Sequence, residues 1–282
     1  MICRTYSDLE KCLGISAKAL YFVSNAPWKH YHTVRIPKND KGDYRELNVP
    51  DEFLKTIQRR ITDRLLNDYP VSPHATAYCS GGSTIVNAKP HIHKNVLLKL
   101  DIHHFFDNIL YTTIKDKVFP AEDYSEPIRV LLTLLCIRKD VLPQGAPSSP
   151  VISNIIMRDF DDTVGRWCDA RSISYTRYRD DMTFSGDFDS REVIDLVRKE
   201  LRKMGLFLND KKTIRVMRGQ RQSVTGIVVN EGMSVPSAYR KKLRQEVYYC
   251  RRFGVEEHLK RTGNAEAPES YLPKLLGRIN YA

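Results

Sequence analysis

The chain has 282 residues, which is enough to bury a substantial core in two or three subdomains. Its 45 lysines and arginines outnumber its 34 acidic residues, so the net charge of +11 favours a polyanionic partner. Six cysteines without CxxC spacing argue against a zinc ribbon or a disulfide framework, and the lack of a long apolar run argues against a membrane protein. We therefore expect a cytoplasmic protein without a membrane partner.

The first half of the chain predicts a helical arm followed by a hairpin and a helix. The arm covers the first 30 residues, and residues 31–50 are typical of strand, turn and strand. Apolar residues at helical spacing predict a helix over 51–69, and residues 78–95 have the composition of a loop. The short apolar run "VLLKLDI", residues 96–102, indicates a strand that is buried on both faces.

The second half predicts a long helix over residues 148–168, with Ser149 as its N-cap and Pro150 in the first helical position. A hairpin follows in "TRYRDDMTFSG", residues 176–186. The remaining predicted elements are a helix over 191–205, strands near 206–210 and 222–230, and a basic helical tail from Pro236.

Three carboxylates draw attention because adjacent negative charges repel each other. Asp180 and Asp181 are neighbours in the hairpin, and Asp101 ends the buried strand. If this strand lies beside the hairpin, the three groups converge at one edge of the sheet, and cations must offset their repulsion. Two Mg²⁺ ions about 4 Å apart, or Mn²⁺ in their place, would do so and would suit phosphoryl chemistry. The alternative is a hairpin tip with exposed acids.

Four segments resemble the ordered boxes of reverse transcriptases. "YRDD" (178–181) is similar to their YxDD box, and "LKLDIHHFFDNI" (98–109) to the segment of their first catalytic aspartate. "LPQGAPSSPVISN" (142–154) resembles their QGxxxSP segment, and "GLFLNDKKT" (205–213) their lysine-bearing segment. The resemblance runs from about Ile36 to the C-terminus, and the order of four boxes makes it much more specific than any single box.

The resemblance implies an active site with two metal ions. Asp101, Asp180 and Asp181 match the metal ligands, together with the backbone carbonyl of Ile102. Lys212 matches the lysine that protonates the leaving pyrophosphate, with Lys211 as an alternative.

The resemblance also implies a deoxynucleotide pocket. Phe106 stands at the place of an aromatic steric gate, although the neighbouring Phe105 leaves the choice of ring open. Gln144 and Gly145 match the segment that lines this pocket. Arg45 resembles the arginine that holds the triphosphate, and Lys38 is either its companion or a solvated hairpin lysine.

Two further segments narrow the resemblance to retron reverse transcriptases, within the superfamily that they share with group II intron enzymes. "NAKPH" (87–91) resembles the NAxxH motif of retron enzymes, and "VTG" (224–226) resembles their VTG triplet. These motifs and the basic tail are expected to contact RNA, the alternative for the tail being a solvated basic helix. The predicted RNA-binding residues are Asn87, His91, Val224, Thr225, Gly226, Arg240, Lys241, Arg244, Arg251 and Arg252.

We therefore expect an α+β right-hand polymerase with an antiparallel palm sheet packed on helices and a helical thumb. The expected division is an N-terminal arm and fingers (1–96), a palm (97–231) with an inserted fingers segment (about 119–149), and a thumb (232–282). The partners implied are deoxynucleotides and a structured noncoding RNA that is primed from a 2′-hydroxyl and copied into branched msDNA. A bacterial cytoplasm, a role in antiphage defence and an effector protein are also implied.

Two alternatives remain open at this point. One is another bacterial reverse transcriptase, of the diversity-generating or phage-defence type. The other is an RNA-binding scaffold with impaired polymerase activity, because Arg179 stands where bacterial relatives usually have a small or apolar residue.

Overall fold

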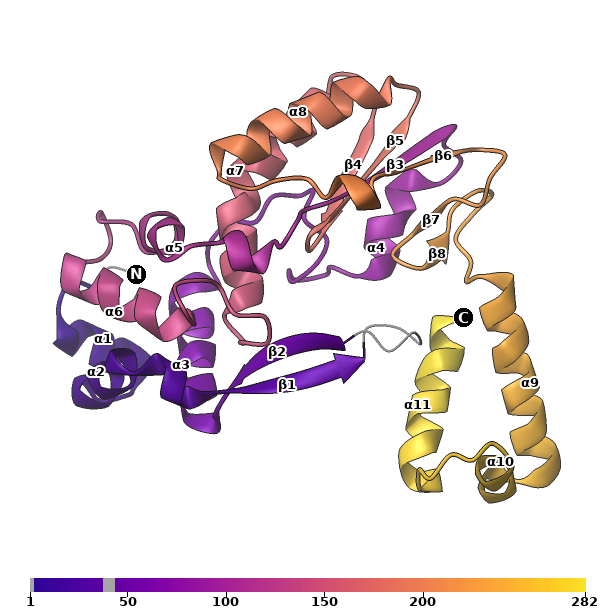
Figure 1. Cartoon of the computed structure of the whole chain (residues 1–282), viewed down its shortest axis with the longest axis horizontal. Coiled ribbons are helices and arrows are strands. Elements are labelled where there is room, and N and C mark those ends of the chain that lie inside the picture. The colour runs from indigo at the N-terminus through magenta and orange to yellow at the C-terminus, as the bar shows by residue number, and fades with distance from the viewer. Residues whose placement is uncertain (1–2, 38–43) are drawn as a thin grey trace.

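The computed structural model describes residues 3–37 and 44–282, and it has a mixed α+β architecture (Figure 1). At its centre lies a four-stranded antiparallel sheet in the order β4–β5–β3–β6. Its strands are β3 (Val96–Asp101), β4 (Ser174–Tyr178), β5 (Asp181–Gly186) and β6 (Ile214–Met217).

Strand β3 is buried on both faces of the sheet, as its apolar sequence predicts. Successive side chains of a strand point to opposite faces. Leu98 and Leu100 join the large core beneath α7 (Ser149–Asp169) and α8 (Ser190–Lys203). Leu97 packs into a smaller cluster with Ala88, Val224, Ile227 and Val229. This second cluster lies under α4 (Thr84–Ala88) and the hairpin of β7 (Ser223–Val224) and β8 (Ile227–Val228).

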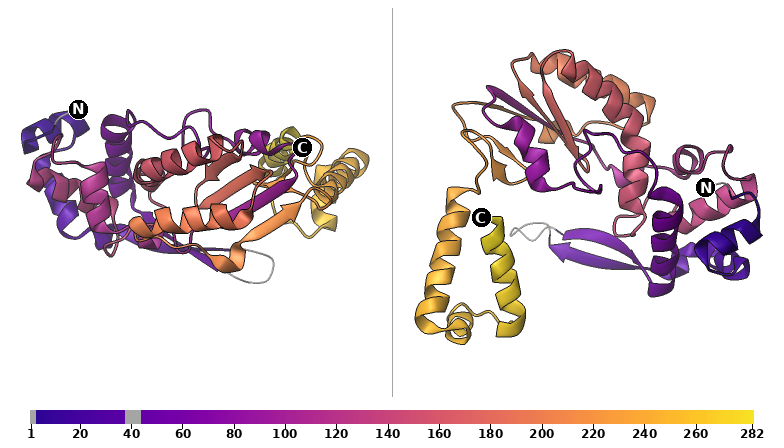
Figure 2. Two further views of the ribbon diagram at one scale, coloured as in Figure 1. Left: turned by 90° about the horizontal axis from the view of Figure 1, so that it is seen from above. Right: turned by 180° about the vertical axis from the view of Figure 1, so that it is seen from behind.

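The N-terminal half forms a helical layer with a projecting hairpin (Figure 2). Strands β1 and β2 pair antiparallel from Tyr31 opposite Pro50 to Pro37 opposite Tyr44, as predicted for residues 31–50. The elements of this layer, including the two strands, are α1 (Tyr6–Leu13), α2 (Ala17–Asn25), β1 (Tyr31–Pro37), β2 (Tyr44–Pro50), α3 (Glu52–Ile61), α5 (Tyr111–Val118) and α6 (Glu126–Cys136).

Three details differ from the sequence prediction. Residues 78–95 contain α4 and a short 3-10 turn at Lys89–His91, so they are not all loop. Residues 206–209 form only an isolated bridge, between Ile102 and Leu208, and the edge strand is β6. Helix α7 begins at Ser149, so its N-cap is Ser148 and Pro150 takes the second helical position, while the Ser149 hydroxyl donates to the carbonyl of Pro143 at 2.7 Å.

The C-terminal residues form a helical unit with its own core. It contains α9 (Ser237–Phe253), α10 (Val255–Arg261) and α11 (Pro268–Tyr281), with α10 joining the other two at the end that lies farther from the sheet (Figure 1). Leu243, Leu259, Tyr271 and Leu275 are buried together, and Val247 and Cys250 pack against them. Leu243, Val247 and Cys250 therefore form the inward face of α9. None of the helices in residues 3–37 and 44–282 has both the length and the apolarity needed to cross a bilayer.

Candidate active site

The three carboxylates meet at one end of the central sheet. Asp101 and Asp181 are directly opposite each other in the antiparallel pair of β3 and β5, so their side chains leave the same face of the sheet. Asp180 precedes Asp181 in the turn between β4 and β5, and its carbonyl accepts a hydrogen bond from the backbone N–H of Ile102 at 3.1 Å. The predicted convergence of the strand end with the hairpin is thus present.

Burial and the neighbouring charges shift the pKa values of the groups in this cluster. Desolvation, together with the charges of Asp180 and Asp101, raises the pKa of Asp181 to about 6. Desolvation and the charge of Asp101 also raise the pKa of Asp180. Lys212 Nζ donates to Asp101 Oδ2 at 2.7 Å, and Asn209 Nδ2 donates to Asp101 Oδ1 at 3.0 Å. Desolvation alone would lower the pKa of Lys212, but its bond to Asp101 and the surrounding carboxylates raise it.

These residues fit divalent cations of the Mg²⁺ type. Burial, together with the neighbouring carboxylates, raises the pKa values of Asp180 and Asp181, and a bound cation would favour their charged forms. In the described part of the chain, no three His, Cys, Asp or Glu side chains are arranged to hold one ion. Mg²⁺ is commonly bound by one or two carboxylates, with substrate phosphates and water completing the shell. Asp101 and Asp180 would supply those carboxylates.

A pocket of about 630 Å³ opens beside the carboxylates. It brings together Asp180, Arg45, Phe106, Gln144 and Gly145 from segments that are far apart in the sequence. Of the two neighbouring phenylalanines, Phe106 lines the pocket and Phe105 does not. The predicted Lys38 lies outside the described residues.

Position 145 requires a glycine because of its backbone conformation and a close contact with β2. Its φ is +114°, a conformation that L side chains rarely adopt. A Cβ atom built there would lie 3.0 Å from the carbonyl oxygen of Asn48 on β2. The N–H of Asn48 donates to the carbonyl of Gln144 at 2.7 Å, so the Gln144–Gly145 segment and β2 form one wall of the pocket.

Several residues of the site were not predicted from the sequence. Lys55 and Arg59 from α3 and Tyr78 line the same pocket, and Asn209 contacts Asp101. Lys55 and Arg59 are one helical turn apart, so they lie on the same face of α3. This spacing of two basic residues is a signal that the sequence does contain. Tyr78 gives no such signal, because its position depends on contacts with α7.

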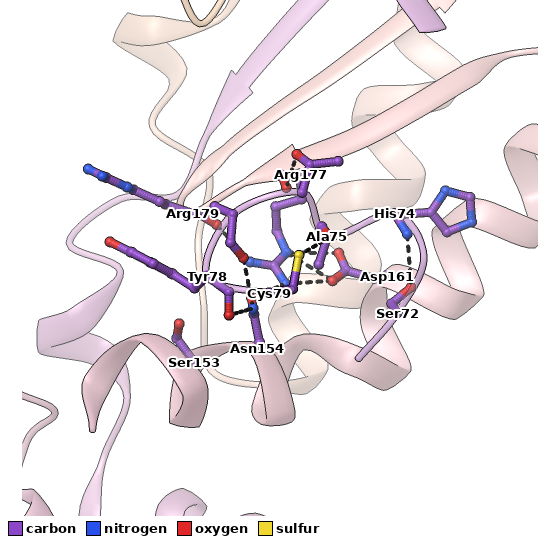
Figure 3. A network of polar contacts seen from close by, with 12 residues as sticks. Ser72, His74, Ala75, Tyr78, Cys79, Ser153, Asn154, Asp161, Arg177 and Arg179 are labelled. Atoms are coloured by element: carbon purple, nitrogen blue, oxygen red, sulfur yellow. Dashed lines mark hydrogen bonds and ion pairs between the residues drawn. The ribbon is translucent and has the colours of Figure 1, made fainter. Parts of the chain in front are cut away.

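A buried polar network holds the hairpin that carries Asp180 and Asp181 (Figure 3). Arg177 and Asp161 form a fully buried ion pair, with Nη2 of Arg177 2.6 Å from Oδ2 of Asp161. The hydroxyl of Tyr175 donates to Asp161 Oδ1 at 2.7 Å. Arg177 also donates from Nη1 to the carbonyl of Arg179 at 2.9 Å and from Nη2 to Asn154 Oδ1 at 3.1 Å. Helix α7 thereby fixes the backbone of the turn.

Comparisons with known proteins agree with this geometry. A family model described as reverse transcriptase (RNA-dependent DNA polymerase) matches residues 36–244. The retron Ec86 reverse transcriptase of Escherichia coli is 30% identical, over 90% of this chain and 81% of that protein. The chain belongs to the retron reverse transcriptases. The retron Mx65 reverse transcriptase of Myxococcus xanthus is 31% identical over 90% of this chain, which spans 65% of that relative's length.

A solved structure of the foamy viral protease-reverse transcriptase with double-stranded DNA shares the fold of this retron family member. Its TM-score is 0.50, with 15% identity over 90% of this chain and 36% of that chain. Because the identity is low, the likeness supports the α+β polymerase fold and nothing further.

Two residues of the retron-type segment "NAKPH", Asn87 and His91, lie in the interior, which corrects the prediction that they contact RNA directly. Both side chains are buried. His91 Nδ1 lies 2.7 Å from Ser185 Oγ, and Nε2 lies 2.8 Å from Thr176 Oγ1, so both ring nitrogens are used within the sheet. Asn87 Oδ1 accepts from Thr76 Oγ1 at 2.7 Å. Their polar atoms serve the fold, because buried donors and acceptors need partners.

The "VTG" segment forms the turn of the small hairpin in this retron family member. Val224 is buried in the second cluster, which likewise corrects its predicted RNA contact. Thr225 and Gly226 occupy the turn with φ of +46° and +87°, and two positive φ values are typical of a two-residue hairpin. Gly226 is exposed and remains compatible with a contact to RNA. The predicted tail residues Arg240, Lys241, Arg244, Arg251 and Arg252 are all exposed.

Proposed function

We propose that this chain extends a DNA strand on an RNA template and makes the branched msDNA of a retron. The observation that carries the proposal is the convergence of Asp101, Asp180 and Asp181 beside a pocket that contains Arg45 and Phe106. A site with paired carboxylates and phosphate-binding cations suits nucleotidyl transfer. The family membership supports the same reaction class.

In this proposal the protein side chains act by binding and orienting. Arg45 holds the triphosphate of the incoming deoxynucleotide, with Lys55 and Arg59 adding positive charge on the same side of the pocket. The ring of Phe106 packs under the sugar and excludes a 2′-hydroxyl. Asp101, Asp180, Asp181 and the carbonyl of Ile102 would hold two Mg²⁺ ions, which would supply positive charge to stabilise the phosphoryl transfer. Lys212, held beside Asp101, donates a proton to the pyrophosphate.

The proposed right-hand arrangement divides the chain into fingers (1–96, with about 119–149), palm (97–231) and thumb (232–282). The separate hydrophobic cluster of α9, α10 and α11 supports the thumb boundary, because a subdomain has its own core. The exposed cations of α9 would contact RNA, an affinity that weakens with salt. Selection of a structured noncoding RNA, priming from a 2′-hydroxyl, and antiphage defence with an effector protein belong to the same proposal.

Two experiments test this function. Primer extension by the purified protein, with deoxynucleotides and Mg²⁺, should lengthen a DNA primer on an RNA template. Absence of extension would instead favour an RNA-binding scaffold. Sequencing of nucleic acid that copurifies with the protein should identify DNA joined to RNA through a 2′-linkage. Unbranched DNA alone would favour another type of bacterial reverse transcriptase.

A further inference from the structure

Arg179 has a backbone conformation that an arginine rarely adopts. It is the first residue of the two-residue turn between Tyr178 and Asp181, which are paired partners in β4 and β5. Its φ is +65°, in the left-handed region that favours glycine. A non-glycine residue in this conformation is commonly associated with a functional site. The conformation of Arg179 therefore suggests that its side chain has a role in the site.

The guanidinium of Arg179 lies close to two tyrosine rings. Its Cζ atom is 5.1 Å from the centre of the Tyr78 ring and 5.6 Å from that of the Tyr178 ring. Both distances are within the range of cation–π attraction. In residues 3–37 and 44–282 it has neither a salt-bridge partner nor a side-chain hydrogen bond, so its N–H groups are available to a ligand.

Buried contacts fix the positions of Arg179 and Tyr78 together. The carbonyl of Arg179 accepts from the buried Arg177, and the carbonyl of Tyr78 accepts from Asn154 Nδ2 at 3.4 Å. Asn154 also donates to the carbonyl of Ala77 at 2.9 Å. Figure 3 shows the side chains of Arg179 and Tyr78 extending in the same direction, away from Asp161. The cation is thus presented on a rigid support.

The pocket also contains other basic residues, which come from different elements. Arg179 and Asp180 line it from the hairpin, together with Tyr78. Arg45, Lys55 and Arg59 line it from β2 and α3. In the proposed reaction, the end of the growing strand must lie next to Asp180, which Arg179 directly precedes. The cations of β2 and α3 remain for the triphosphate.

We propose that Arg179 is a phosphate-binding residue of the active site, held by Tyr78 and Tyr178, that contacts the backbone phosphate at the growing end of the DNA strand. This inference rests on the proposed function and adds a specific contact to it. A guanidinium presents a planar set of donors that matches phosphate oxygens. Stacking on rings orders this group without consuming its donors.

The test compares Arg179→Asn and Arg179→Lys with the wild type. Asparagine tolerates a positive φ and removes the charge, while lysine keeps the charge without the planar group. Arg171→Asn is the matched control, because the Arg171 guanidinium is also exposed and lies 4.1 Å from the centre of the Trp167 ring, away from the pocket. The probe is a DNA primer annealed to an RNA template, with the 3′ end of the primer recessed.

The Kd of the duplex and the KM for the deoxynucleotide distinguish a contact with the strand backbone from a contact with the triphosphate. For Arg179→Asn we expect the Kd of the duplex probe to rise about 10-fold. The slope of log Kd against log salt concentration should decrease by about one, because one phosphate contact is lost. The KM for the deoxynucleotide at saturating duplex should stay within about 2-fold, because other cations hold the triphosphate. Arg179→Lys should recover part of the affinity, and Arg171→Asn should match the wild type.

Three outcomes would overturn the inference. An unchanged Kd and salt dependence in Arg179→Asn would mean that the stacked cation has only a structural role. A raised KM with an unchanged duplex Kd would assign the contact to the triphosphate and overturn the assignment to the strand. Faster extension by Arg179→Asn with unchanged binding would mean that the arginine merely crowds the site. Duplex binding is measured without catalysis, so this test remains readable if the wild type fails to extend primers.

Discussion

The side chains of Asn87 and Thr225 are hydrogen bonded to each other although they are 138 positions apart, with Asn87 Nδ2 donating to Thr225 Oγ1 at 3.4 Å. Thr225 Oγ1 donates in turn to the carbonyl of Thr84 at 3.2 Å. The segments "NAKPH" and "VTG" thus form one hydrogen-bonded unit on a face of the central sheet. Their joint presence in the sequence has a structural reason, independent of any RNA contact.

Replacing Asn87 should therefore weaken the fold. In Asn87→Ala the hydroxyl groups of Thr76 and Thr225 lose a partner, and we expect the free energy of unfolding to fall by about 1–3 kcal/mol. Urea unfolding measures this change. Asn95→Ala is the control, because the Asn95 side chain bonds Asp187 at an exposed site. Activity per folded molecule should fall equally on structured RNA and on a generic annealed primer, and selective loss on structured RNA would contradict the structural role.

His91 should make stability depend on pH. Burial, with a smaller effect of the charge on Lys94, lowers the pKa of His91 to about 3. The unfolded chain binds this proton near pH 6.5, so the contribution is complete above that pH and is lost as the pH falls toward 3. The loss is about 1.4 kcal/mol per pH unit, or about 2 kcal/mol between pH 6.5 and 5.

The measurement is the free energy of unfolding at pH 7 and pH 5, for the wild type and for His91→Asn. The variant is less stable at pH 7, but its stability should fall less between the two pH values, because it has no imidazole to protonate. Equal losses in the two proteins would show that His91 does not titrate on unfolding.

The metal-site assignment predicts that Asp180→Asn abolishes DNA synthesis while the fold survives. Loss of one ligand charge should raise the barrier by more than about 3 kcal/mol, which is more than about 100-fold in rate. Primer extension together with thermal unfolding checks both halves of this statement. Asp187→Asn, at the other end of β5, is the control. Near-normal extension by Asp180→Asn would refute the assignment.

The sugar-gate assignment predicts that Phe106→Ala increases incorporation of ribonucleotides relative to deoxynucleotides. Removing the ring enlarges the pocket at the place where we propose that the sugar lies. The ratio of kcat/KM for the two substrates is the readout, since it reports discrimination independently of the amount of active enzyme. An unchanged ratio in an active variant would place the gate on another residue.

The buried ion pair predicts that a single substitution lowers the free energy of unfolding much more than a double substitution does. Asp161→Leu leaves the Arg177 charge without its partner and should cost about 3–5 kcal/mol. Asp161→Leu combined with Arg177→Met removes both charges and should recover most of that loss. Urea unfolding of the single and double variants tests this. A double variant as unstable as the single one would mean that the hydrogen bonds to Arg179 and Asn154 matter more than the pair.

The parts of the fold that sequence predicts best are those with strong local patterns. Strand β3 was predicted because its apolar run fits burial on both faces, and α7 because its apolar residues recur at helical spacing. Helix α4 was missed because five residues between glycine-rich and proline-containing segments carry too little periodicity. The convergence of the carboxylates followed from one assumed strand pairing, which the structure contains.

The parts that sequence could not predict depend on burial of polar groups. Asn87 and His91 have side chains that are equally suited to RNA and to an internal network, and only tertiary packing distinguishes the two. Arg177 and Asp161 are likewise charged residues that usually lie at a surface, yet the structure buries them completely. Tyr78 joined the site through contacts with α7 that no spacing in the sequence encodes.

The separate core of α9, α10 and α11 has a consequence for cooperativity. Leu243, Leu259, Tyr271 and Leu275 contact one another and not the main core, so the helices of this unit obtain their cohesion locally. Regions with their own small core open at a lower free energy than the rest of the molecule. The backbone amides of α9 and α11 are therefore expected to exchange hydrogen for deuterium as one early group, well before those of β3.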